Sequence, residues 1–360
     1  MGAPKPFPTR WPEPEERPDH NDPERERPEE PTPSEHFPDQ DPGAWPEFRL
    51  RPQAVTWAIT NPCNLRCFHC YDATTEKRRD LPTNKAMEVI EWLRDAGVRF
   101  IVFSGGEPLL RRDLLDLMAH CQHLEIGVGL RTNATLIKDD LPRQLKELGI
   151  GVVGTSLDGA TNESHDIMRG VGMFQRTISG IKALVGTGIR VNVEVVLGKH
   201  NMREAPQFVE LAEALGVAEL NFSALTPQGR GVSLEHLFLD RATWSQLVME
   251  LRSLSMGAGI VVSPSCALVG NCVACVEPNV TCDGWVTPCY LSSQKLFSIF
   301  GTPPGEFALR LGRSRPVFQN VCGRGRWIVP HEPIKDHSRS ANRPLTDAGA
   351  AALSKPFVPI

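Results

Sequence analysis

From residue 54 onward, short apolar runs alternate with longer segments in which apolar residues recur at helical spacing. A run of about four to eight apolar residues is typical of a buried strand, whereas apolar positions at i, i+3, i+4 and i+7 are typical of an amphipathic helix. This pattern predicts six strands, at residues 55–60, 99–103, 126–130, 150–156, 190–197 and 218–223.

Three predicted helices have a well-defined apolar stripe, which is expected to face the core. The stripes consist of Ala86, Val89, Ile90 and Leu93, of Phe208, Leu211, Ala212 and Leu215, and of Trp244, Leu247, Val248 and Leu251. The third stripe belongs to a helix predicted at 241–255.

Strands that alternate with helices indicate an α/β fold with a parallel sheet. Six such strands predict a partial (β/α)6 barrel, in which active-site residues gather at the carboxyl ends of the strands. The periodicity fades after residue 255, so we predict a domain boundary near residue 256. Residues 51–256 would form the barrel, residues 257–325 a small cysteine-rich domain, and residues 326–360 an irregular tail. A diverged or frame-shifted tail is a hypothesis for the unusual composition beyond Phe300.

Residues 1–50 differ in composition from the rest of the chain. They contain 13 prolines and many acidic residues, with too few apolar side chains to offset the entropy of ordering. We therefore predict a disordered extension. A partner-binding arm and a start codon assigned too far upstream are the alternatives.

The whole chain of 360 residues is 41% hydrophobic and has a formal net charge of -4. This charge gives no electrostatic reason to expect nucleic acid or an anionic membrane as a partner. No apolar run approaches the roughly 20 residues of a membrane helix, and the charged, Pro-rich start is unlike a signal peptide. We expect a cytoplasmic protein, in which seven of the ten cysteines are metal ligands rather than disulfide partners.

The most informative motif is a cysteine triplet just after the first predicted strand. Cys63, Cys67 and Cys70 have the spacing C-x3-C-x2-C. Iron–sulfur clusters are normally held by four thiolates, so three thiolates leave one iron of a cubane open to a substrate or cofactor. The alternative is a zinc site, which needs a fourth ligand such as the intervening His69.

The triplet and two further motifs, in this order, resemble the radical S-adenosylmethionine (SAM) superfamily. Gly105-Gly106-Glu107-Pro108 follows the second predicted strand, and Thr155-Ser156-Leu157-Asp158-Gly159 ends the fourth. A zinc site leaves the second motif unexplained. The resemblance implies a radical SAM barrel with a 4Fe-4S cluster on the triplet and SAM bound at its open iron.

The resemblance also implies which residues bind SAM. These are Gly105, Gly106, Glu107, Asn133, Ser156, Asp158 and Arg169. The Gly-Gly-Glu run would border the methionyl amino group, since glycine lets backbone approach a ligand closely. The last three would lie near the ribose or carboxylate. Asn133 matches a Thr-Asn-Gly segment of the family in which Ala134 replaces the glycine. For Ser156 and Asp158, ordinary turn chemistry is the alternative.

A second cysteine set, with the spacing C-x2-C-x13-C, consists of Cys272, Cys275 and Cys289. It resembles the auxiliary-cluster domains of the superfamily, called twitch in the short form and SPASM in the long form. The resemblance implies one auxiliary 4Fe-4S cluster, with Cys322 or the substrate at the last site. Cys266 and Cys282 are substitutes, and a zinc ribbon is the alternative.

Tyr290 follows Cys289, at the place where sulfatase-maturing relatives have an aspartate base. We predict an aromatic packing role for it. Donation of a proton or hydrogen atom, which would make Tyr290 a candidate catalytic residue, is the alternative.

Residues 221–231 resemble the segment that ends the sixth strand in enzymes of haem-side-chain, pyrroloquinoline-quinone and modified-peptide pathways. The resemblance implies a maturase that cleaves SAM reductively to a 5′-deoxyadenosyl radical and abstracts hydrogen from a peptide or cofactor precursor. Ferredoxin or flavodoxin would supply the electron.

Two other functions remain open. One is a non-catalytic iron–sulfur or zinc-binding scaffold or electron carrier. The other is a molybdenum-cofactor cyclase, which the sequence disfavours because Glu277 and Asn279 stand where the cyclase has arginines for a triphosphate.

Overall fold

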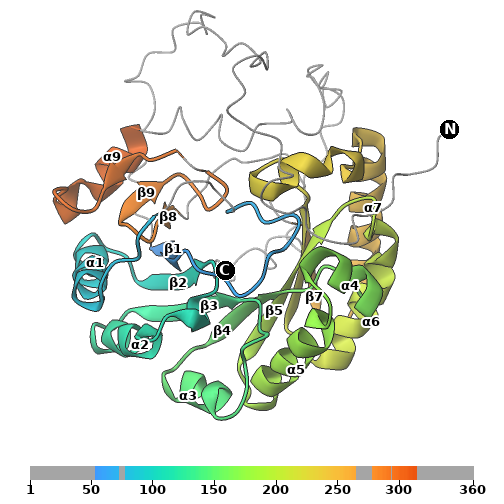
Figure 1. Cartoon of the computed structure of the whole chain (residues 1–360), viewed down its shortest axis with the longest axis horizontal. Coiled ribbons are helices and arrows are strands. Elements are labelled where there is room, and N and C mark those ends of the chain that lie inside the picture. The colour runs from blue at the N-terminus through green and yellow to red at the C-terminus, as the bar shows by residue number, and fades with distance from the viewer. Residues whose placement is uncertain (1–52, 73–77, 265–277, 293, 314–360) are drawn as a thin grey trace, which may run out of the picture. The chain divides into compact units, whose positions relative to one another are not determined.

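The computed structural model of the protein describes residues 53–72, 78–264, 278–292 and 294–313 (Figure 1). The chain divides into two units, Met1–Phe48 and Arg49–Ile360, and all described residues belong to the second. The predicted extension at residues 1–50 and the tail at residues 326–360 lie outside the described residues. Within the described ranges, no helix has both the length and the apolar character needed to cross a bilayer.

Six parallel strands form the middle of the sheet, each paired with the next along the chain. They are β1 (Ala54–Thr60), β2 (Phe100–Gly105), β3 (Gly127–Thr132), β4 (Val152–Ser156), β5 (Arg190–Leu197) and β6 (Glu219–Ala224). Each overlaps one predicted strand, and the ends differ by at most two residues. The predicted α/β fold with a partial parallel barrel is confirmed.

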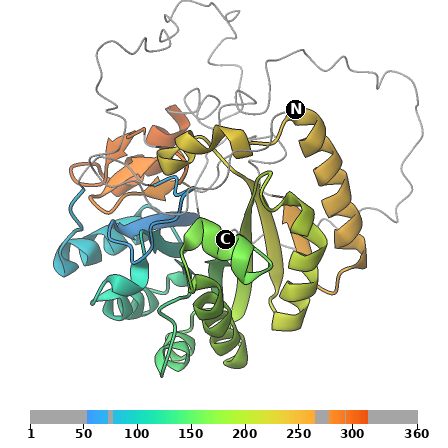
Figure 2. The ribbon, with the colours of Figure 1, turned by 45° about the vertical axis from the view of Figure 1, so that its right-hand side comes forward.

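Helices connect the strands and lie along the outer side of the curling sheet (Figures 1 and 2). The α-helices are α1 (Thr83–Asp95), α2 (Leu114–His123), α3 (Leu141–Glu147), α4 (Asn162–Arg169), α5 (Met173–Gly186), α6 (Ala205–Leu215), α7 (Arg241–Gly257) and α9 (Phe307–Arg313). Short 3-10 helices are η2 (Pro108–Leu110), η3 (Met202–Glu204), η4 (Gly229–Leu237) and η5 (Pro304–Glu306). The three predicted stripes face the core, although Leu211 and Val248 at their margins are only partly buried.

The sheet continues on both edges beyond the six predicted strands. β7 (Val261–Pro264) pairs in parallel with β6, and β8 (Asn279–Val280) pairs in parallel with β1. β9 (Trp285–Thr287) and β10 (Phe297–Ser298) then add antiparallel strands next to β8. The sheet therefore extends past residue 256, while the division into a barrel and a cysteine-rich domain remains a prediction.

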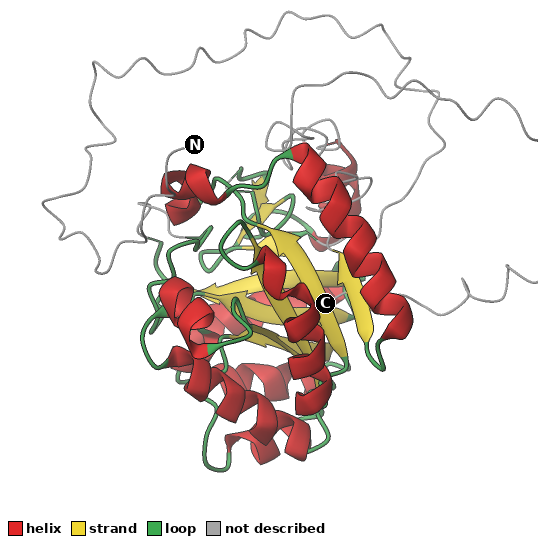
Figure 3. Cartoon of the chain, turned by 90° about the vertical axis from the view of Figure 1, so that its right-hand side faces the viewer, coloured by secondary structure: helices red, strands yellow, loops and turns green. Residues whose placement is uncertain are grey.

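The core lies between the sheet and the helices that cover it (Figure 3). Trp57 of β1 is fully buried against Phe103 of β2, with ring centroids 5.8 Å apart. The Trp57 indole also donates to the carbonyl of Thr281, at 3.3 Å. This contact ties the first strand to the β8–β10 segment.

Because the six central strands are parallel, their carboxyl ends meet at one edge of the sheet. The cysteine triplet follows β1, the Gly-Gly-Glu run ends β2, Asn133 follows β3 and Asp158 follows β4. The topology thus gathers these motifs at one edge, as the sequence predicts.

Candidate functional site

The three cysteines lie in one loop after β1, the cysteine loop, defined as residues 61–72. Cys63 is exposed, Cys67 and Cys70 are half-buried, and all three are free thiols. Within the described ranges, no three His, Cys, Asp or Glu side chains converge on the position of a single metal ion. A cubane does not require such convergence, because each thiolate binds a different iron.

The glycines of the Gly-Gly-Glu run pack against the cysteine loop itself. A Cβ atom on Gly106 would lie 2.2 Å from the carbonyl oxygen of Pro62 and 2.3 Å from that of Asn61. The Gly106 amide donates to Thr60 O, and the Glu107 amide donates to Pro62 O, both at 2.8 Å. The absent side chain therefore makes room for the chain's own backbone just before Cys63.

Glu107 joins the ends of β2 and β3. Its side chain is fully buried. Oε1 accepts hydrogen bonds from the Thr132 hydroxyl at 2.7 Å and from the Leu109 amide at 3.1 Å, while Oε2 accepts one from the Asn133 amide at 2.9 Å. Burial raises the pKa of Glu107, and these hydrogen bonds only partly oppose that effect.

Asn133 connects β3 to the cysteine loop. Its side-chain amide donates to Asn64 Oδ1 at 2.9 Å, and its own Oδ1 accepts from the amide of Thr135 at 3.0 Å. Glu107 and Asn133 thus lie in one hydrogen-bonded group with the loop that carries the triplet.

Asp158 is a second centre of contacts, and its side chain is completely buried. Oδ1 accepts from the Val196 amide at 3.0 Å. Oδ2 pairs with Arg169 Nε and, at 3.1 Å, with His69 Nε2. Burial alone would raise the pKa of Asp158, but Arg169 and His69 outweigh it and hold this pKa well below its ordinary value.

Arg169, the last residue of α4, lies between Asp158 and Cys67. Its Nη1 is 3.9 Å from Cys67 Sγ. Burial raises the pKa of Cys67 to about 11 although the guanidinium opposes this rise. The structure thus brings Asp158, Arg169 and one cysteine of the triplet together. Ser156 ends β4 at the same edge, half-buried and in register with Glu194 of β5.

The segment after β6 binds the second half of the cysteine loop, at Cys67 and Cys70. Arg230 donates through its amide to Cys70 O at 3.0 Å and through Nε to Cys67 O at 2.7 Å. A Cβ atom on Gly229 would lie 2.3 Å from Cys70 O. From the sequence, residues 221–231 indicate a maturase but predict no contact with the cysteine loop, because only the fold brings them to it.

A cavity of about 260 Å³ opens between the cysteine loop and the β8–β10 segment. Its lining includes Ala58 of β1, Ser104 of β2, Tyr71, Gly229, Thr281 and Tyr290. The rings of Tyr71 and Tyr290 meet edge to face with centroids 5.6 Å apart, and the Arg131 guanidinium is 5.3 Å from the Tyr290 ring centroid. Tyr290 therefore packs against Tyr71 and Arg131 and also borders this cavity.

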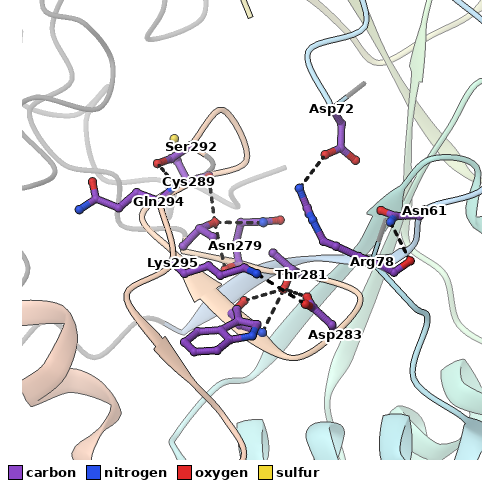
Figure 4. A network of polar contacts seen from close by, with 12 residues as sticks. Asn61, Asp72, Arg78, Asn279, Thr281, Asp283, Cys289, Ser292, Gln294 and Lys295 are labelled. Atoms are coloured by element: carbon purple, nitrogen blue, oxygen red, sulfur yellow. Dashed lines mark hydrogen bonds and ion pairs between the residues drawn. The ribbon is translucent and has the colours of Figure 1, made fainter. Parts of the chain in front are cut away.

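Asp72, Arg78 and Lys295 line the same cavity, and Figure 4 shows their polar contacts. Arg78 Nη2 lies 3.8 Å from Asp72 Oδ1, and Lys295 Nζ lies 3.9 Å from Asp283 Oδ2. Burial raises the pKa of Asp72, while Arg78 opposes that rise. The cavity is thus partly aromatic and partly charged.

Only part of the second cysteine set can be placed. Cys289 is buried, and its carbonyl accepts a hydrogen bond from the Thr287 hydroxyl at 3.1 Å (Figure 4). Cys282 is also buried. Cys266, Cys272, Cys275 and Cys322 lie outside the described residues.

Comparison with known families matches residues 57–212 to the Radical SAM superfamily. The chain is 36% identical over 193 residues to the Fe-coproporphyrin III synthase of Methanosarcina barkeri. The aligned region covers 52% of this chain and 48% of the relative. The chain is 31% identical over 185 residues to the mycofactocin maturase MftC of Mycobacterium ulcerans, and that alignment covers 51% and 50%. The chain thus spans about half the length of these curated relatives.

Among solved structures, Streptococcus suis SuiB bound to S-adenosylmethionine is similar in fold. The TM-score is 0.62 at 17% identity, over 73% of this chain and 68% of SuiB. A further structure of SuiB holds its precursor peptide SuiA. At this identity the likeness concerns the fold alone.

Proposed function

Because residues 57–212 match the Radical SAM superfamily, we propose that the protein is an enzyme that cleaves SAM reductively. The resulting 5′-deoxyadenosyl radical would take hydrogen from a peptide or a cofactor precursor. The observation that carries this proposal is the cysteine loop, which presents three free thiols at the carboxyl edge of the parallel strands.

The donor set of the loop fits a 4Fe-4S cluster with one open iron. Three thiols and no fourth cysteine lie on this loop, on one exposed residue, Cys63, and two half-buried residues, Cys67 and Cys70. The Leu65 amide donates to Cys63 Sγ at 3.4 Å, and the Arg169 guanidinium is near Cys67 Sγ. Both contacts favour the thiolate form that ligates iron. Once bound, the cluster and SAM supply the radical chemistry.

The chain's own residues would hold the loop in a fixed conformation. Gly106 and Glu107 support its beginning, Asn133 binds Asn64, and Arg230 binds the carbonyls of Cys67 and Cys70. In this proposal, SAM would lie at the strand edge that carries the residues which the resemblance assigns to it, including Ser156.

The cavity beside Tyr71 and Tyr290 is the proposed place of the reacting part of the substrate. At about 260 Å³ it is slightly smaller than the roughly 300–1,000 Å³ typical of whole-ligand sites. It would therefore receive one side chain of a peptide or one arm of a cofactor precursor. The relatives named as a maturase and as a porphyrin synthase support both classes.

An auxiliary 4Fe-4S cluster on Cys272, Cys275, Cys289 and Cys322 is part of the proposal. Its support is the cysteine spacing and the position of Cys289, directly before the cavity-lining Tyr290. A ferredoxin or flavodoxin would deliver the electron.

The test is anaerobic reconstitution with iron and sulfide, followed by incubation with SAM and dithionite and chromatography of the products. We expect 5′-deoxyadenosine and methionine from the native chain and none from Cys63→Ala, Cys67→Ala or Cys70→Ala. Cys121→Ala, a buried position in α2, is the matched control and should keep the activity. Full iron loading without SAM cleavage in the native chain would instead identify a scaffold or electron carrier.

A further inference from the structure

Both carboxylate oxygens of Asp158 are used inside the protein. Oδ1 accepts from the Val196 amide, and Oδ2 binds both Arg169 and His69. The side chain is 0% exposed. Asp158 thus contacts the cysteine loop and α4, whereas the resemblance places it near the ribose or carboxylate of SAM.

The contacts of Asp158 converge on the middle of the cysteine loop. His69 lies between Cys67 and Cys70, and Arg169 reaches Cys67 Sγ at 3.9 Å. The Phe68 amide also donates to Met168 O at 2.9 Å. The end of α4 and residues 67–69 therefore form one packed unit around a buried ion pair.

The Arg169–Asp158 ion pair lies next to Cys67 Sγ, a proposed cluster ligand, where its charges would act on the cluster. A one-electron reduction would add one negative charge to a cluster bound there, and the Arg169 cation, 3.9 Å from Cys67 Sγ, would stabilise that charge. The Asp158 anion behind the guanidinium reduces the effect. Neither side chain is more than 9% exposed, so water screens these charges weakly. Hydrogen bonds and charges near the sulfurs are known to set the potentials of iron–sulfur centres.

We propose that Arg169 and Asp158 are positioning residues that set the reduction potential of the cluster on Cys63, Cys67 and Cys70. Arg169 favours the reduced cluster, and Asp158 limits how much of the Arg169 charge acts on Cys67. The electron comes from the external donor, and no bond is made or broken in the protein. This inference rests on the proposed function, because it requires the cluster to bind.

The experiment measures midpoint potentials of the reconstituted full chain, without SAM, by a dithionite titration followed by electron paramagnetic resonance. Arg169→Gln removes the cation and leaves the anion. We expect the midpoint potential to become more negative by at least 59 mV. For a one-electron couple this shift is a tenfold change in the ratio of oxidised to reduced cluster at a given potential. Asp158→Asn leaves the cation uncompensated, and we expect a shift in the opposite direction.

Two variants serve as controls. Arg169→Lys keeps the charge, and we expect a smaller shift than in Arg169→Gln. Arg143→Gln disrupts an exposed ion pair of similar chemistry, between Arg143 of α3 and Asp140 just before that helix, and we expect the native potential.

Opposite shifts in Arg169→Gln and Asp158→Asn are the signature of an electrostatic role. Shifts of the same sign, or native potentials in both variants with full iron loading, would overturn the inference and leave the proposed function intact. If Arg169→Gln does not load iron, the sign of the shift in Asp158→Asn decides. A native chain that forms no reducible cluster contradicts the proposed function instead.

Discussion

At the scale of residues, the absence of one Cβ atom, at Gly106, allows the backbone of the cysteine loop to pass close by. The Gly106 position lies so close to Asn61 and Pro62 that no side chain fits without moving backbone. The Gly105–Glu107 run therefore has a structural task that precedes any contact with a ligand. The Gly106 amide binds Thr60 O at the end of β1, and the Glu107 amide binds Pro62 O in the loop, both at 2.8 Å.

The first prediction concerns Gly106→Ala. The new Cβ would meet two backbone carbonyls at 2.2 and 2.3 Å, so the loop must shift. We expect a loss of about 1–3 kcal/mol in the free energy of unfolding, as for other overpacked sites. Urea denaturation measures this free energy, and iron content after reconstitution reports the loop.

Gly151→Ala is the matched control, because a Cβ atom at this position would have nothing within 4 Å. We expect native stability and native iron content in this variant. Equal behaviour of the two variants would show that the Gly106 contact does not constrain the loop.

At the scale of elements, the six central strands could be predicted, whereas the short strands added at the edge of the sheet could not. The central strands are apolar runs long enough to show strand character, so their ends are placed to within two residues. β8 and β10 have only two residues each and β9 has three, which is too short for any periodicity. β8 pairs with β1, which is distant in sequence, and β9 and β10 then extend the sheet from β8.

The candidate site divides in the same way. Motifs at strand ends could be predicted because parallel strands share one edge. The role of Arg230 could not be, because it depends on η4 folding back onto Cys67, which lies 163 residues earlier in the chain. His69 was noted as a possible zinc ligand, whereas its Nε2 lies 3.1 Å from Asp158.

The second prediction concerns the η4 segment and the variant Arg230→Lys. Lysine lacks the Nε–H that donates to Cys67 O at 2.7 Å, while the backbone bond to Cys70 O remains. We expect faster loss of iron to a chelator, with a change in unfolding free energy of only about 0.5–1.5 kcal/mol, that of one hydrogen bond.

Stopped-flow chelation by a ferrous-iron chelator gives the release rate. Arg203→Lys, at an exposed position of η3, is the control and should release iron at the native rate. If Arg230→Lys releases iron at the native rate, the hydrogen bond from Arg230 Nε to Cys67 O does not stabilise the loop against iron loss.

At the scale of the whole described unit, the carboxyl-terminal segment packs back onto the first β/α repeat. Trp92 of α1 donates to Thr302 O at 2.6 Å and meets the Phe307 ring edge to face, at 5.3 Å between centroids. β8 extends the sheet beside β1. Residues on both sides of the predicted boundary at 256 therefore share one sheet and one core.

The third prediction follows from this shared core and concerns Phe307→Ala. Phe307 is 0% exposed and contacts both Trp92 and Phe297, so its truncation should cost about 3–5 kcal/mol. If the segment and the barrel unfold together, the single urea transition, followed by fluorescence and by circular dichroism, moves to lower urea with both signals still coincident. Leu309→Ala, at 53% exposure, should change stability by less than about 0.5 kcal/mol. The opposite outcome is two separate transitions in Phe307→Ala, in which one of the two signals keeps its native midpoint and the other changes at lower urea. It would establish the carboxyl-terminal segment as an independent domain. That result would place the boundary near residue 256 after all, because the shared sheet would then not transmit stability across it.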